Sequence, residues 1–166
     1  VINNNISLKN LRYGLHFMFS NNNKYIKNTF EENGVGVAVM YSYGILMKSN
    51  KFISNWGPSS YGLLLKEIKD SKIQSNLFEG NTKGIYGESV IRVNIIHNDF
   101  KSNGWAMQMM GSSEQDTIRY NNFISNTFDI STNQNAINYS VYINNYWSHY
   151  NGYDLDKDGI GDIPYR

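Results

Sequence analysis

The sequence predicts an all-β fold, a right-handed parallel β-helix of about six to seven coils with 22–26 residues each. The first observation is a repeated phrase of the form Asn-x-Phe-x-x-Asn, which begins at Asn28, Asn50, Asn76, Asn98 and Asn121. A fixed period of this length is typical of stacked structural units. The second observation is a spacing of inward residues in which steps of two alternate with steps of three. The chain lacks the 3.6-residue periodicity that a leucine-rich repeat would require.

The coil that starts at Gly36 illustrates each expected element. Val37 and Val39 alternate with their neighbours, which is the period-2 pattern of a half-buried strand. The inward positions that follow are Ser42, Ile45, Met47, Asn50, Phe52 and Asn55. We expect each step of two to form a short strand and each step of three to turn a corner, so that one coil contains three strands. The neighbouring coils fit the same spacing, with a four-residue insertion at 57–60 in the next one.

The inward asparagines and phenylalanines should stack from coil to coil. Each corner Asn is expected to bond turn backbone groups on adjacent coils, which would build amide ladders along the structure. An apolar stack is predicted from Phe30, Phe52, Phe78, Phe100 and Phe123. The repeat fades at 144–146, so we assign residues 1–146 to the parallel β-helix and residues 147–166 to a C-terminal cap.

Composition excludes several classes of function. The formal net charge is +1, from 15 basic and 14 acidic residues, so we expect no nucleic-acid partner. The absence of Cys excludes disulfides and thiolate metal sites. The chain has no run of 18 apolar residues, and it starts at Val1 without a signal peptide or an initiating Met, so we expect it to be a piece of a longer protein.

Two outward columns emerge when the strands that follow each Gly are overlaid. One column contains His16, Ala38, Leu64, Tyr86 and Gln108, and the other contains Met18, Met40, Lys66, Glu88 and Met110. His16, Met18 and Met40 fall on two adjacent coils, and an imidazole with thioethers favours Cu(I) over Mg²⁺ or Ca²⁺. Met110 is a further candidate metal ligand. An outward Met is also common as a packing residue and a single His as a surface residue, and the columns alone leave that alternative open.

An acidic segment near the C-terminus resembles the start of a Ca²⁺-binding loop. Asp154, Asp156, Asp158, Ile160 and Asp162 occupy positions 1, 3, 5, 7 and 9, with Gly159 at position 6 for the sharp turn. Position 12 is Tyr165 instead of a bidentate Glu, and no helical pattern flanks the segment, so we do not expect a complete EF-hand. A calcium loop and a polar turn whose carboxylates bond local N–H groups both remain open.

Several strings resemble the NosD family of periplasmic β-helix proteins, which are needed to assemble the copper clusters of nitrous oxide reductase. These strings are 13–21, 35–42, 62–65, 111–114 and 145–162, in the family's order. The resemblance implies that His16, Met18 and Met40 match the family's His and Met motifs. Gln108 and His149 depart from it, since a His and an Asp are usual there. The chain corresponds to the C-terminal portion of a family member.

The resemblance also implies a location and partners. The expected protein is extracytoplasmic, works with an ABC transporter permease and ATPase, receives copper from a chaperone lipoprotein and passes it to nitrous oxide reductase. The main alternative is a polysaccharide lyase or hydrolase, or a non-catalytic carbohydrate binder that stacks sugars on its tyrosines, and a third is a structural spacer. A polysaccharide-cleaving enzyme needs clustered carboxylates on one face, whereas the outward columns hold only Lys66 and Glu88, so no catalysis is expected.

Overall fold

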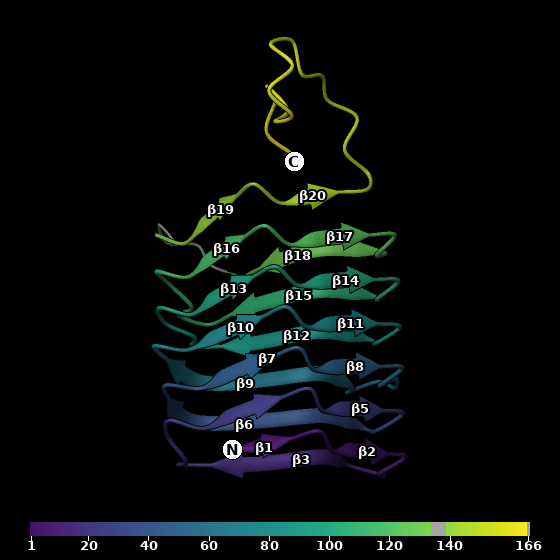
Figure 1. Cartoon of the computed structure of the whole chain (residues 1–166), viewed down its shortest axis with the longest axis vertical. Helices are drawn as coiled ribbons and strands as arrows, with labels where there is room; N and C mark the ends of the chain where they lie inside the picture. Colours follow the sequence, from purple (N-terminus) through teal and green to yellow (C-terminus); the bar gives the residue numbers. More distant parts are fainter. Residues whose placement is uncertain (134–138, 166) are drawn as a thin grey trace.

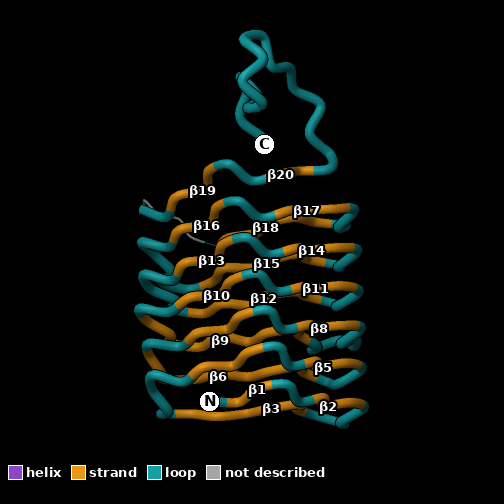
Figure 2. The backbone as a smooth tube through the Cα atoms, viewed as in Figure 1, coloured by secondary structure: helices purple, strands orange, loops and turns teal. Residues whose placement is uncertain are grey.

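The computed structural model describes residues 1–133 and 139–165, and in these residues it contains strands and loops but no helix (Figures 1 and 2). In the described residues, twenty strands form three parallel sheets of seven, seven and six strands. Each of the first six coils contributes one strand to every sheet, and the last coil contributes β19 and β20 to two of them. The coils stack directly above one another from the N-terminus to β20, which confirms the predicted parallel β-helix (Figure 1). No helix in the described residues is long and apolar enough to cross a membrane.

We call the three sheets A, B and C. Sheet A consists of β1 (Ile2–Asn3), β4 (Lys24–Ile26), β7 (Leu46–Lys48), β10 (Lys72–Gln74), β13 (Asn94–Ile96), β16 (Thr117–Arg119) and β19 (Val141–Ile143). Sheet B consists of β2 (Ile6–Leu8), β5 (Thr29–Glu31), β8 (Lys51–Ile53), β11 (Leu77–Glu79), β14 (Asp99–Lys101), β17 (Asn122–Ile124) and β20 (Tyr146–Trp147). Sheet C consists of β3 (Tyr13–Met18), β6 (Val35–Tyr43), β9 (Tyr61–Lys69), β12 (Lys83–Glu88), β15 (Trp105–Met110) and β18 (Phe128–Thr132).

The predicted phenylalanine stack is present in the core. Consecutive rings of Phe30, Phe52, Phe78, Phe100 and Phe123 are nearly parallel, with centroids 5.5, 4.7, 4.9 and 5.0 Å apart. Each ring lies on the middle residue of a sheet B strand, and the strands pair in register. Each ring therefore buries its faces against the rings of neighbouring coils.

The asparagine ladders are also present, one at each end of sheet B. At Asn50, the backbone N–H and the side-chain Nδ2 both donate to Oδ1 of Asn76, at 2.8 and 3.0 Å. The same Nδ2 donates to the carbonyl of Tyr25 on the preceding coil, at 2.9 Å. The second ladder repeats this pattern between Asn55 and Asn81. Burying these side-chain amides costs little free energy, because each one is hydrogen-bonded to the coils on both sides.

The residue directly before each ladder Asn has a left-handed backbone conformation, which the spacing alone does not reveal. Lys27, Ser49 and Ser75 have φ of 54°, 56° and 54° directly before Asn28, Asn50 and Asn76. A non-glycine residue in this region costs about 1–2 kcal/mol. The ladder hydrogen bonds offset that cost and hold the turn, so the corners do not require glycine.

The segment after β20 turns back toward the last coil. Trp147 stacks on Phe123 at 4.3 Å, and Tyr165 stacks on the other side of Trp147 at 4.6 Å. The Tyr165 hydroxyl donates to Oδ2 of Asp129 at 2.9 Å. Two aromatic residues thus continue the phenylalanine stack and cover its C-terminal end.

Candidate metal sites

The copper candidates converge on the outward side of sheet C. Strands β3 and β6 pair in parallel with Met18 opposite Met40 and His16 opposite Ala38. His16 and Met18 are two residues apart on one strand, and both are exposed, with Met18 39% exposed. Neighbouring strands are about 4.8 Å apart, so the two thioethers and the imidazole share one small patch of surface.

Aromatic rings border this patch on both sides. Phe19 and Tyr41 follow the two methionines in left-handed conformation, with φ of 50° and 52°, and their rings stack with centroids 5.0 Å apart. Tyr13 contacts the His16 ring at 4.6 Å. Phe19 was not identified from the sequence as a neighbour of the copper candidates. The only available signal was that Phe19 occupies the position equivalent to Tyr41 one coil earlier.

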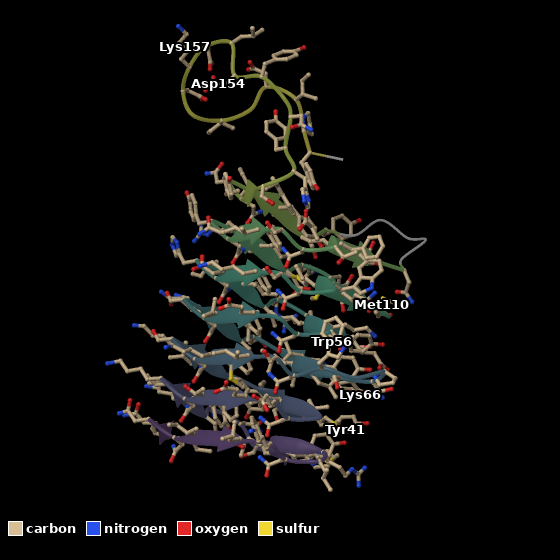
Figure 3. The ribbon with its side chains drawn as sticks, turned by 90° about the vertical axis from the view of Figure 1, so that its right-hand side faces the viewer. Tyr41, Trp56, Lys66, Met110, Asp154 and Lys157 are labelled. Atoms are coloured by element: carbon tan, nitrogen blue, oxygen red, sulfur yellow. The ribbon has the colours of Figure 1, made fainter. Side chains whose placement is uncertain are left out.

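An ion pair occupies the next positions of the methionine column. Lys66 lies opposite Met40 in register, and its Nζ is 3.3 Å from Oε1 of Glu88 on the following coil. The hydrogen bond that Lys66 donates to Glu88 raises the pKa of Lys66, and the charges of Glu88 and Tyr41 add to this. The soft donors therefore end at Met40, and a positive charge lies beside them (Figure 3).

Met110 lies in the same column but apart from the other candidates. It pairs with Glu88, so three strand spacings, about 14 Å in total, separate it from Met40. One ion cannot contact both residues. Met47, Met107 and Met109 are buried in the core, and the inward spacing predicted this for Met47. Ala38 differs from its predicted solvent-facing environment: it is fully buried, because its methyl group is shorter than the neighbouring side chains of the column.

Two of the outward tyrosines, Tyr61 and Tyr86, contact each other and a lysine. Tyr61 and Tyr86 have centroids 5.0 Å apart, and Nζ of Lys83 lies 5.0 and 5.2 Å from the two rings. In residues 1–133 and 139–165, the one convergent group of three or more His or acidic side chains is in the acidic loop.

The acidic loop brings three carboxylates together. Ligand atoms of Asp154, Asp156 and Asp158 lie within 4.8 Å of one another. Oδ2 of Asp154 accepts a hydrogen bond from the Gly159 N–H at 2.9 Å, whereas its Oδ1 is buried without a hydrogen-bond partner. Gly159 has φ of +86°, which suits a sharp turn at position 6. Asp154 and Gly159 also border a cavity of about 670 Å³ between the last coil and the C-terminal segment.

Other bonds in this loop match the polar-turn interpretation. Oδ1 of Asp158 accepts from the N–H of Ile160 at 2.7 Å, and Oδ2 of Asp162 accepts from the N–H of Leu155 at 2.6 Å. In these bonds the Asp side chains accept from local N–H groups, as a polar turn requires. The arrangement is therefore compatible with both interpretations, and the unpartnered Oδ1 of Asp154 is the atom that favours a cation.

Comparison with known proteins agrees with the family that the sequence resembles. The family described as "Periplasmic copper-binding protein (NosD)" matches residues 1–152, which include the His16, Met18 and Met40 patch and exclude the acidic loop. A relative from Pseudomonas aeruginosa, named "Probable ABC transporter binding protein NosD", is 30% identical over 123 residues, covering 64% of this chain and 29% of the relative. The chain thus spans less than a third of that relative's length. Because the match extends over nearly all of the coils, the chain belongs to the NosD family of periplasmic copper-binding proteins.

Proposed function

We propose that this chain binds Cu(I) through His16, Met18 and Met40 on the outward side of sheet C. The observation that carries the proposal is the register pairing of Met18 with Met40, with His16 two residues away on the same face. Two thioethers and one imidazole are soft donors that suit Cu(I). The patch is shallow and exposed, so a partner protein would complete the coordination shell. Such an open site suits transfer of the ion better than permanent storage.

The biological role that we propose is extracytoplasmic delivery of copper for cluster assembly in nitrous oxide reductase. The family description supports a periplasmic location and copper binding, and the relative's name supports association with an ABC transporter. In this proposal a chaperone lipoprotein supplies the copper, and the permease and ATPase of the transporter act with the chain. The chain itself acts by binding and has no catalytic activity.

A competition titration with a Cu(I) chelator tests the copper site. Met18→Ala and Met40→Ala should each weaken binding by about tenfold or more, which corresponds to 1.4 kcal/mol or more. Met110→Ala is the matched control, because it removes the same side chain from the same column about 14 Å away. All three variants should keep the parent's melting temperature, since these side chains point outward. The proposal is wrong if the parent does not bind, or if Met110→Ala weakens binding as much as Met40→Ala.

We also propose that the acidic loop binds calcium. Asp154, Asp156 and Asp158 supply convergent oxygens, and Ile160 and Asp162 occupy the remaining loop positions. Calcium takes six to eight oxygen ligands, so water molecules would complete its shell in this exposed loop. The buried Oδ1 of Asp154, which lacks a protein partner, supports this proposal over a purely structural turn.

A further inference from the structure

The outward side of sheet A carries a row of positive charges. The middle residue of each of its three-residue strands from β4 to β16 is buried, so the two flanking residues point outward. These outward positions include Lys24, Lys48, Lys72 and Arg119, all of which are exposed. Lys27 adds a further cation at the corner that follows β4. We call these five residues the basic face.

No acidic residue balances the basic face. The strands of sheet A contain no Asp or Glu, and none of the five cations forms an ion pair in the part of the chain that the structure describes. Of the corner carboxylates beside sheet A, Asp70 forms a bidentate pair with Arg92 at 2.6 and 2.8 Å, and Asp116 is buried at 1% exposed. A chain with a net charge of only +1 thus concentrates unpaired positive charge on one side.

Aliphatic side chains lie between the cations. Ile26 and Leu46 occupy outward, partly exposed positions on the same strands, and Val141 and Ile143 of β19 are 49% and 50% exposed. The seven strands of sheet A rise in one column, which spans about 30 Å at the usual strand spacing (Figure 1). Alternating cations and aliphatic groups on a flat surface are typical of segments that lie in the headgroup region of a bilayer.

We propose that the basic face of sheet A docks on an anionic phospholipid bilayer. Each Lys or Arg near an anionic membrane adds a comparable increment of attraction, so five cations on a flat face act together. The cations are spread over β4, β7, β10 and β16 of the sheet, which fits a planar, laterally mobile counter-surface better than a single acidic side chain of a protein partner. The exposed aliphatic groups then contact the headgroup–acyl boundary.

This orientation leaves the copper patch accessible, a consequence that rests on the proposed copper function. The outward side of sheet C is a different face of the coil, and Tyr41, Lys66 and Met110 project together from one side of the stack (Figure 3). His16, Met18 and Met40 would therefore remain exposed to partners while sheet A contacts lipid. The lipid interaction itself needs no metal, so failure of the copper site would not affect it.

Sedimentation with lipid vesicles tests the proposal on the metal-free 166-residue protein. The parent should sediment with vesicles of phosphatidylcholine and phosphatidylglycerol at low ionic strength, and not with vesicles of phosphatidylcholine alone. Added salt should release it, because screening weakens the attraction. The triple variant Lys24→Gln, Lys48→Gln, Lys72→Gln should lower the partition coefficient on the order of a hundredfold.

A second triple variant controls for net charge. Lys9→Gln, Lys101→Gln, Lys157→Gln removes three cations outside sheet A and gives the same net charge of −2, from +1 minus 3. It should bind vesicles within about threefold of the parent. An equal loss in both triples would overturn the proposal, since total charge would then be responsible. Equal binding to neutral vesicles, or binding to a soluble acidic polypeptide with none to vesicles, would also overturn it. Circular dichroism should confirm that both variants keep the fold.

Discussion

Asp116 is a buried carboxyl group that should make the stability of the β-helix depend on pH. It is 1% exposed and lies on the corner that leads into sheet A. Burial raises its pKa from 3.8 to about 7, a hydrogen bond from the Val93 N–H at 2.8 Å opposes the shift, and the charge of Glu114 adds to it. The carboxyl group is therefore protonated in the folded protein at pH values where it is ionised in the unfolded chain.

The direction in which stability changes with pH follows from this difference in proton binding. Between pH 4 and 7 the folded state holds one more proton than the unfolded state at this site, so stability falls as pH rises. The contribution is fully present below pH 4 and is lost as pH passes through 7. A shift from 3.8 to about 7 corresponds to on the order of 4 kcal/mol.

Asp116→Asn removes the titration but keeps an Oδ1 acceptor for the Val93 N–H. Chemical denaturation of both proteins at pH 4, 6 and 8 should show similar free energies of unfolding at pH 4. At pH 8 the free energy of unfolding of the variant should exceed that of the parent by up to about 4 kcal/mol. The neighbouring Glu114 also contributes, so Glu114→Gln should produce a smaller change in the same direction. If Asp116→Asn leaves the pH dependence of unfolding unchanged, or is less stable than the parent at pH 8, the reasoning is refuted.

Two further predictions concern the core and the acidic loop. Phe78→Ala should lower the free energy of unfolding by about 3–5 kcal/mol, because Phe78 is fully buried between the rings of Phe52 and Phe100. Phe19→Ala, at a residue 73% exposed, should change it little, and similar losses in both variants would contradict the stacked core. Millimolar Ca²⁺ should raise the melting temperature, because a ligand that binds only the folded form stabilises it. The double variant Asp156→Asn, Asp158→Asn should abolish that rise while Asp99→Asn keeps it, and an unchanged parent melting curve would leave the polar-turn interpretation.

The repeat in the sequence is sufficient to determine most of the fold. Steps of two and three between inward residues placed Met47, Phe52 and the ladder residue Asn50 in the core, where the structure confirms them. The same register put Met18 beside Met40, because parallel coils of equal length bring equivalent positions together. Periodicity succeeds here because each coil repeats the environment of the one before it.

Two features of the coils depended on the tertiary structure. The stacking of Phe19 on Tyr41 follows from left-handed backbone at both residues, which spacing does not encode. The basic face was hidden because the near-neutral net charge sums over all three sheets. Only the assignment of each outward position to one sheet separates Lys24, Lys48 and Lys72 from the acidic residues on the other faces.

The C-terminal segment shows the limit of sequence reasoning. Its acidic spacing is local, so the sequence alone identified Asp154, Asp156 and Asp158 as neighbours, which the structure brings within 4.8 Å. The contact of Tyr165 with Trp147 and Asp129 joins residues far apart in the chain and outside any repeat. Local periodicity determined which side chains face inward, whereas the path of a non-repeating segment depends on which distant surface it can cover, and only the folded coils provide that surface.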